Sequence, residues 1–250
     1  MAGKIIMQTA RKYKSTIVPI DSEHSALFQL LQNKKHNEIE KIILTASGGP
    51  FLYWRRIDLR NVTPWEALKH PVWRMGNKIT VDSATMINKG FEVIEAHHLF
   101  NIDYDKIDVI IHPQSIIHSM IQTIDGEIYA QLSPPDMKYP ILIALAYPER
   151  LENPFQRLSL EKIKKLTFER PDYKKFPLLK YAYEIGKKGG NLPAALTVAD
   201  EIAVKLFLQR KIKFNQIFKT IKNIVESIKF IENPDIEDIF NTEKYILQTF

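Results

Sequence analysis

The sequence GNKITVDSATMINKGFEVIEA occupies residues 76–96, and the organisation of the chain can be worked out from it. Lys78 to Val81 predict the last part of a strand or an extended segment. Asp82, Ser83 and Thr85 are typical of a helix start, because their side chains can accept hydrogen bonds from the free amides of a first turn. From Met86 onward the apolar residues recur at helical spacing, which predicts an amphipathic helix.

The opposite face of this predicted helix carries Asn88, Glu92 and Glu95, with Lys89 beside them. A helix N-terminus near two hydroxyl groups and a lysine is suited to binding phosphate, and a carboxylate one turn later could hold a metal ion or accept a proton. Taken alone, the stretch favours a simpler interpretation, in which these polar residues face solvent and Lys89 pairs with Glu92.

The composition is that of a globular protein with a core large enough for one large domain or two ordinary ones. The chain has 250 residues, a net charge of +6 and no cysteine, which excludes disulfides, thiolate zinc sites and a cysteine nucleophile. Its lysines come as scattered doublets, so we expect an anionic small-molecule substrate and no nucleic acid. No apolar run or signal-like segment predicts a membrane association, and we expect a cytoplasmic protein.

Glycine is scarce, with only 9 residues, and neither a GxGxxG pattern nor a P-loop occurs. A dinucleotide-binding turn uses such glycines to let the backbone approach the pyrophosphate. These residues alone therefore predict no nicotinamide-nucleotide domain.

The order of predicted elements indicates an α/β (α+β) part followed by an all-helical part. Proline-rich sequence around residues 148–171 suggests a connection between them. The hairpin is predicted from alternating residues around Asp125-Gly126. The predicted helices are 3–13, 25–32, 140–146, 178–185, 194–208, 214–230 and 236–249, and the predicted strands are 16–20, 41–45, 107–111, 115–124 and 127–132.

Several polar residues are candidates for chemistry. Asp21 and Glu23, two positions apart, could join Glu92 as oxygen ligands of a hard divalent cation, although Asp21 and Ser22 could simply cap the next helix. Ser47 in a Ser-Gly-Gly loop could face an anion, or it could be only part of a turn. His70 and Trp73 lie in a loop that is either a lid or an ordinary surface loop. We expect His112 and His118, about 20 Å apart on an extended segment, to be structural or supporting groups.

Seven segments together closely resemble the 1-deoxy-D-xylulose 5-phosphate reductoisomerase family, nearly from end to end. The segments are DSEH at 21–24, SGGPF at 47–51, HPVWRMG at 70–76, VDSATM at 81–86, NKGFE at 88–92, HPQS at 112–115 and PDMK at 135–138.

The resemblance implies a role for each of thirteen residues. Asp21, Glu23 and Glu92 would be the catalytic ligands of Mn²⁺ or Mg²⁺, and Ser22 and Glu23 would meet the ketone and hydroxyl groups of the substrate. The remaining expected roles are a phosphate cradle of Ser47, Ser83, Asn88 and Lys89, a mobile lid of His70, Trp73 and Met75, and a nicotinamide-nucleotide contact at Gly76 and Met137.

The family resemblance implies an NADPH-dependent rearrangement and reduction of 1-deoxy-D-xylulose 5-phosphate to 2-C-methyl-D-erythritol 4-phosphate, in the non-mevalonate route to isoprenoids. It implies a homodimer and an N-terminal Rossmann-like NADPH-binding domain. We expect residues 1–20 to be the last helix and strand of that domain, residues 21–150 the catalytic domain, 151–172 a linker and 173–250 a C-terminal helical domain. The family's Asn-Lys-Glu-Ser segment would lie just before Met1, so a separate nucleotide-binding piece is one expected partner.

Two alternatives stay open from the sequence. The chain could be an inactive remnant, or it could be a metal-dependent sugar-phosphate binding module without redox chemistry. One departure from the family pattern affects the helical part, because Asp200 stands in Ala199-Asp200-Glu201 where the family usually has asparagine.

Overall fold

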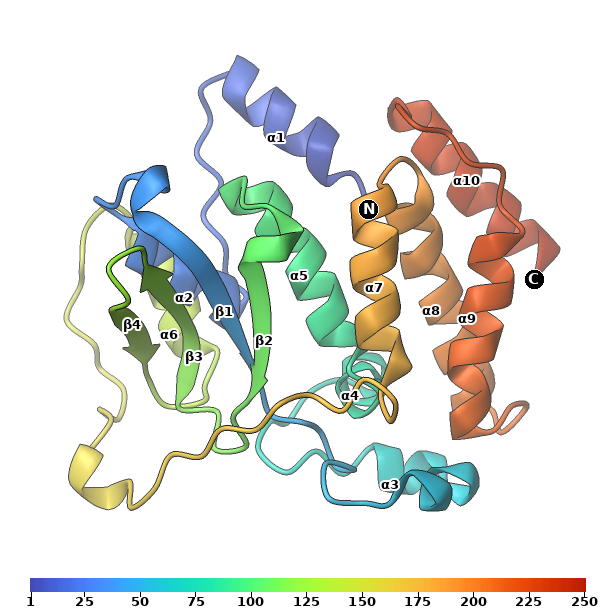
Figure 1. Cartoon of the computed structure of the whole chain (residues 1–250), viewed down its shortest axis with the longest axis horizontal. Coiled ribbons are helices and arrows are strands. Elements are labelled where there is room, and N and C mark those ends of the chain that lie inside the picture. The colour runs from blue at the N-terminus through green and yellow to red at the C-terminus, as the bar shows by residue number, and fades with distance from the viewer.

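A computed structural model describes all of residues 1–250, and it contains one mixed sheet and two groups of helices (Figure 1). The strands are β1 (Ile39–Ala46), β2 (Ile107–Ile111), β3 (Ile117–Thr123) and β4 (Ile128–Leu132). The helices are α1 (Gly3–Lys12), α2 (Ser22–Leu31), α3 (Pro64–Ala67), α4 (Asn77–Thr85), α5 (Ile87–Phe100), α6 (Lys138–Ala146), α7 (Pro177–Lys188), α8 (Leu192–Leu208), α9 (Ile217–Glu226) and α10 (Ile236–Thr249).

The strand order in the sheet is β2-β1-β3-β4. β1 pairs in parallel with β2, with Leu44 opposite Val109, and antiparallel with β3, with Ile42 opposite Ile121. β3 and β4 form the hairpin that the sequence predicts. A parallel pair needs a long crossover, and here the crossover contains α4 and α5.

Helix α5 lies between the sheet and the helical part of the molecule (Figure 1). On one side α2 and α5 cover one face of the sheet, and on the other side α5 packs against α7. A single cluster of 42 buried apolar residues runs from Leu27 in α2 to Ile246 in α10. The sheet and helices α7–α10 therefore share one core, and α5 is the element that joins them.

The α5–α7 contact is close because Gly90 has no side chain. A Cβ atom at Gly90 would lie only 2.5 Å from the Cβ of Ala182 in α7. The two backbones can approach one another at this point only because both residues are small.

The segment between α6 and α7 runs past one end of the strands on its way to α7 (Figure 1), and it contacts the sheet at two residues. Its Leu166 packs on Ile43, Ile117 and Met120, and Glu169 forms an isolated antiparallel bridge with Ile111. The domain boundaries at residues 20, 150 and 172 stay a prediction. None of the helices is both long and apolar enough to cross a lipid bilayer.

Most predicted elements are confirmed, with four corrections. The predicted strand at 16–20 is wrong: this segment is extended but pairs with no strand, and Ile20 is 52% exposed. Lys78–Val81 are helical, since α4 begins after Gly76 and a hydrogen bond from the Thr80 hydroxyl to the Gly76 carbonyl closes its first turn. His112 and His118 are not joined by extended chain, because Ser115 turns the backbone with a φ of 51°.

The fourth correction concerns the start of the helix that carries Glu92. Asp82, Ser83 and Thr85 belong to the last turn of α4 instead of the first turn of α5. The two helices meet at Met86, whose φ of 63° is left-handed and ends α4. Ser83 and Thr85 nevertheless lie beside the N-terminus of α5, and the Thr85 hydroxyl oxygen is 3.4 Å from the Ile87 amide nitrogen.

Candidate active site

A cavity of about 250 Å³ lies where β1, α2, α5 and the loop at 70–76 meet. Twelve of the thirteen side chains singled out in the sequence line this cavity. They are Asp21, Ser22, Glu23, Ser47, His70, Trp73, Met75, Ser83, Asn88, Lys89, Glu92 and Met137. The thirteenth, Gly76, does not line it: this residue is exposed at the start of α4, and the space beside its Cα is open.

Three carboxylates converge on one point of the cavity. Oxygen atoms of Asp21, Glu23 and Glu92 all lie within 4.8 Å of one another. Asp21 and Glu23 come from the start of α2, where Asp21 caps the helix by accepting a hydrogen bond from the Glu23 amide at 3.0 Å. The capping and ligand interpretations are therefore compatible, because the cap uses only one oxygen of Asp21.

Hydrogen bonds between α2 and its neighbours fix where these acids lie. His24 in α2 is buried, and its Nε2 atom is 2.9 Å from the Glu92 carbonyl oxygen in α5. The Ser119 hydroxyl in β3 donates to the Glu23 carbonyl at 3.0 Å. Helix α2 is thus held to both α5 and the sheet at the turn that carries the acids.

Lys89 lies inside the acidic cluster. Its Nζ atom is 3.0 Å from a Glu23 oxygen and 2.5 Å from a Glu92 oxygen, and its side chain is buried. The other oxygen of Glu92 accepts a hydrogen bond from the Asn88 amide at 2.7 Å, and the other oxygen of Glu23 accepts one from Ser22 at 2.6 Å. The lysine therefore supplies the only cationic contact to two of the three acids.

Ionisation of all three acids is unfavourable, because the carboxylates are buried and repel one another. Burial, with the charge of Glu23 added, raises the pKa of Asp21 to about 6 and raises the pKa of Glu92 well above its usual value. Burial also opposes ionisation of Glu23, but the charge of Lys89 outweighs it and lowers the pKa of Glu23 to about 2. The cluster therefore favours an added positive charge.

This arrangement fits a hard divalent cation. Magnesium and manganese prefer carboxylate oxygens and leave other positions for water and substrate. One ion of that kind could contact all three acids within the spacing found here, and it would relieve the repulsion that raises the pKa values of Asp21 and Glu92.

His70 holds the loop at 70–76 against the cavity. Its Nδ1 atom accepts hydrogen bonds from the amides of Val72 and Trp73, at 3.1 and 2.8 Å. A nitrogen that accepts two amide hydrogens carries no proton, so Nε2 carries it and donates to the Ser47 hydroxyl oxygen at 3.0 Å. Burial lowers the pKa of His70 to about 4, in agreement with a neutral ring.

The same contacts orient the Ser47 hydroxyl. Its oxygen accepts from His70 and from the Gly49 amide, the latter at 3.3 Å. With its acceptor positions used, Ser47 can direct its own hydrogen into the cavity. A hydroxyl in that state is a donor to an anion.

Two further residues line the cavity: His118, which the sequence predicts to be a structural or supporting group, and Arg74, to which it gives no role. His118 reaches it from β3, and its ring lies 6.2 Å from that of Trp73 in an edge-on contact. Arg74 adds a second cation to the lining. Nothing in the sequence gives the direction of these side chains, since alternation along β3 is disturbed by a register shift near Ile117.

The chain supplies little for a dinucleotide. Met137 lines the cavity and is 37% exposed, and open space lies beside Gly76. These two residues could touch one end of NADPH, but no glycine-rich turn is present to bind its pyrophosphate.

Comparison with known families gives two matches along the chain. A family model described as the 1-deoxy-D-xylulose 5-phosphate reductoisomerase C-terminal domain matches residues 17–100. A second, described as the DXP reductoisomerase C-terminal domain, matches residues 132–248.

Proteins named 1-deoxy-D-xylulose 5-phosphate reductoisomerase are similar throughout the matched region. The one from Persephonella marina is 56% identical over 90% of this chain and 60% of that protein. The one from Desulfitobacterium hafniense is 51% identical over 97% of this chain and 63% of that protein. The chain thus spans about three fifths of the length of these relatives.

Solved structures of the same kind share the fold. The reductoisomerase from Zymomonas mobilis in complex with NADPH has a TM-score of 0.92 and 42% identity, and the alignment covers 98% of this chain and 63% of that one. A reductoisomerase structure with NADPH, fosmidomycin and magnesium has a TM-score of 0.91 and 41% identity, with 99% of this chain and 65% of that one covered.

Proposed function

This chain belongs to the 1-deoxy-D-xylulose 5-phosphate reductoisomerase family, and we propose that it supplies the metal site and the sugar-phosphate site for that reaction. The reaction is the NADPH-dependent rearrangement and reduction of 1-deoxy-D-xylulose 5-phosphate to 2-C-methyl-D-erythritol 4-phosphate. The observation that carries the proposal is the convergence of Asp21, Glu23 and Glu92 within 4.8 Å, in the same cavity as Ser47, Asn88 and Lys89.

The three acids would hold Mg²⁺ or Mn²⁺, which supplies Lewis-acid polarisation of the substrate carbonyl when bound. Ser22 and Glu23 would contact the ketone and hydroxyl groups next to that ion. Asn88 and Lys89 fix the position of Glu92 through their contacts with its two oxygens. Magnesium in three of the similar structures supports a divalent cation, and the oxygen ligands suit either metal.

The phosphate group would lie at the other end of the cavity, near the N-terminus of α5. Ser47 has its hydrogen free to donate, and Ser83 and Asn88 line the same space. Lys89 can donate to a phosphate oxygen once a metal ion takes over the charge of Glu23 and Glu92. The helix N-terminus adds further partial positive charge.

His70, Trp73 and Met75 would form the lid over the reacting groups. In the structure described here Trp73 lies against His118, and His70 ties the loop to Ser47. A lid in this position excludes water from the substrate.

NADPH would supply the hydride, and Gly76 and Met137 would touch its nicotinamide end. The NADPH in the Zymomonas mobilis structure supports this cofactor for the family. A homodimer and a separate nucleotide-binding partner are further parts of the proposal, which sedimentation of the purified chain with and without such a partner would test.

A two-step experiment tests the function. Calorimetry on the 250-residue chain should show fosmidomycin or 1-deoxy-D-xylulose 5-phosphate binding only when Mn²⁺ is present. NADPH oxidation should be absent with the chain alone and should appear when the nucleotide-binding domain of a relative is added.

The outcomes separate the alternatives. Metal-dependent ligand binding without turnover in the presence of the added domain would favour a binding module without redox chemistry. Absence of both would favour an inactive remnant. Oxidation of NADPH by the chain alone would contradict the proposal, since it requires a nucleotide site absent from these residues.

A further inference from the structure

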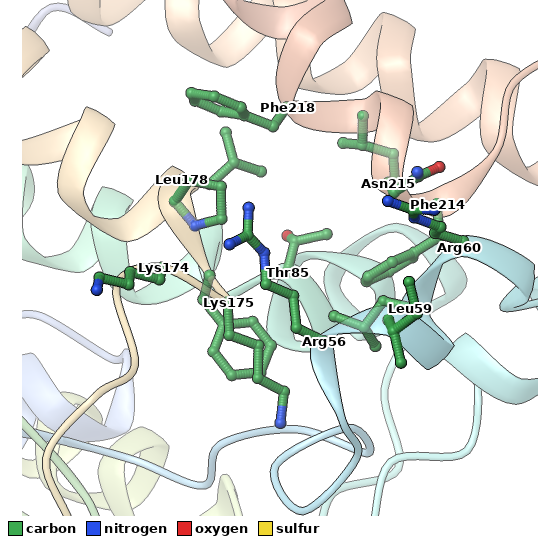
Figure 2. Close-up of a pocket in the computed structure, with 14 residues that line it drawn as sticks. Arg56, Leu59, Arg60, Thr85, Lys174, Lys175, Leu178, Phe214, Asn215 and Phe218 are labelled. Atoms are coloured by element: carbon green, nitrogen blue, oxygen red, sulfur yellow. The ribbon is translucent and has the colours of Figure 1, made fainter.

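A second cavity, of about 610 Å³, lies on the other side of the α4–α5 junction (Figure 2). Its walls come from the 3-10 turn at Arg56–Asn61, the start of α7 and the start of α9. Four of its lining residues are cations, namely Arg56, Arg60, Lys174 and Lys175, and none is an aspartate or glutamate. We refer to it as the basic cavity.

The charges in the basic cavity are largely uncompensated. Arg56, Arg60 and Lys174 form no ion pair with their side chains. Lys175 donates to the Leu52 carbonyl at 2.7 Å. By contrast, the adjacent Arg55, which does not line the cavity, forms an ion pair with Asp58 at 2.9 Å. The chain thus neutralises the neighbouring arginine and leaves the cavity arginines free.

The Arg56 side chain projects into the middle of the cavity, whereas the Lys174 side chain extends outward at its edge (Figure 2). Figure 2 shows the Arg56 guanidinium in the middle of the cavity, between Leu178 and Thr85, with Arg60 on one side and Lys174 on the other. Helix α7 begins at this point without a side-chain cap, so its first-turn amides add partial positive charge.

The floor beneath these cations is apolar. Leu59, Phe176, Leu178, Phe214 and Ile217 all line the cavity and are themselves buried. An inorganic anion would contact only the arginines. A ligand that also has an apolar part would bury apolar surface against these side chains and should bind more tightly.

We propose that the basic cavity is a second anion site, which binds a small organic phosphate that carries an apolar group. Arg56 and Arg60 hold the phosphate, since guanidinium groups match phosphate oxygens in pairs. The apolar part packs on Phe176 and Phe214. This ligand need not be the substrate, because the basic cavity is separate from the cavity that contains Glu92.

The position gives the site a direct structural link to the candidate active site. Thr85 lines the basic cavity, and the adjacent Met86 lines the cavity of Glu92. Thr85 is the last residue of α4, and Met86 is the left-handed residue that joins α4 to α5. An occupant of the basic cavity would therefore contact the wall that also positions Ser83 and Asn88.

Calorimetric titration with n-hexyl phosphate and inorganic phosphate, without divalent metal, tests the proposal. Hexyl phosphate should bind at least tenfold more tightly than inorganic phosphate. The Arg56→Ala/Arg60→Ala double variant should weaken hexyl phosphate binding at least tenfold. Arg55→Ala removes the same kind of side chain outside the cavity and should have no effect.

Lys89→Met distinguishes the two anion sites. This variant should bind hexyl phosphate as tightly as the wild type does. If Lys89→Met loses binding while the arginine double variant keeps it, the ligand lies in the candidate active site and the proposal is overturned. Wild-type affinity in the double variant would also overturn it, as would equal affinities for the two phosphates. Arg55, Arg56 and Arg60 are exposed, so circular dichroism should show a folded chain for their variants. Lys89 is buried, so circular dichroism of Lys89→Met must match the wild-type spectrum before its binding is compared, and the arginine variants test the proposal without it.

Discussion

The Nζ atom of Lys78 lies 2.5 Å from an oxygen of Asp200, and this contact joins α4 to α8. The same nitrogen is 2.7 Å from Asp82, so one lysine serves two buried carboxylates. The sequence resemblance implies an asparagine at the position where this chain has Asp200. The Asp200 side chain is buried, so its negative charge carries a desolvation penalty that lowers the stability of the fold unless a cation offsets it.

The first prediction concerns the pH dependence of stability. Burial, with the charge of Asp200 added, raises the pKa of Asp82 to about 8. Between about pH 4 and pH 8 the folded chain keeps a proton that the unfolded chain releases, so stability should fall as pH rises, by up to about 1.4 kcal/mol per unit. Asp200→Asn should reduce this slope. Urea unfolding at several pH values measures it, with the exposed Glu201→Gln as control, and an unchanged slope in Asp200→Asn would contradict the assignment.

Glu92→Gln tests the metal site, since it removes one charged ligand and keeps the size of the side chain. Manganese affinity should fall by about two orders of magnitude, or roughly 2.7 kcal/mol. Glu95→Gln is the matched control, because Glu95 lies on the same helix but does not line the cavity of Glu92. Calorimetry that finds equal affinity in wild type and Glu92→Gln would remove Glu92 from the ligand set.

Lys89→Met should change metal and phosphate binding in opposite directions. Loss of the cation from the acidic cluster should strengthen Mn²⁺ binding, because the ion no longer competes with a positive charge. Loss of its hydrogen bonds should weaken 1-deoxy-D-xylulose 5-phosphate binding by about 1.5–3 kcal/mol. The unphosphorylated sugar is the comparison ligand, and equal losses for the two sugars would assign Lys89 a purely structural role.

The lid prediction uses tryptophan fluorescence. Trp73 lies at the cavity, whereas Trp54 and Trp65 are exposed elsewhere. Addition of Mn²⁺ and fosmidomycin together should change the emission of the wild-type chain, because the bound ligand excludes water near Trp73. Trp73→Phe should abolish most of that change. If the full change persists in the variant, the signal comes from another tryptophan and the lid role has no support.

Gly90→Ala tests the contact between α5 and α7. The added methyl group would lie 2.5 Å from the Ala182 Cβ, so we expect a loss of about 1–3 kcal/mol in the free energy of unfolding. Adding Ala182→Gly should restore part of the loss, because it removes the opposing methyl group. A double variant no more stable than Gly90→Ala would show that the two residues do not act on one another.

The sequence predicts the periodic elements and the composition of the candidate site well. Twelve of the thirteen predicted residues line one cavity, since the family motifs are long and each polar residue has a distinct position. The predicted metal ligands and lid roles stay predictions. Local pattern could not show that Asp21 would cap α2 and still face Glu23 and Glu92, because that depends on how α2 and α5 pack.

The errors have local physical causes. Ile79, Thr80 and Val81 favour strands in isolation, but the helix start at Gly76 and the buried face of α4 outweigh that preference. The left-handed Met86 was not predictable, because a residue other than glycine rarely adopts this conformation. Thr16–Ile20 has strand-like residues, but a strand also needs a neighbour to bond with, and none lies beside it here.

Helix α5 has one face in the candidate site and another in the helical core, with Glu92 and Gly90 only two residues apart. A ligand that fixes Glu92 therefore also favours the packed state of α5 on α7. Thermodynamic linkage makes this relation reciprocal. Better packing of α5 on Ala182 should therefore raise the affinity of the site for its ligand, although Ala182 does not line the cavity. Sequence variation in α7 is thus a means of tuning binding without any change to the residues that bind.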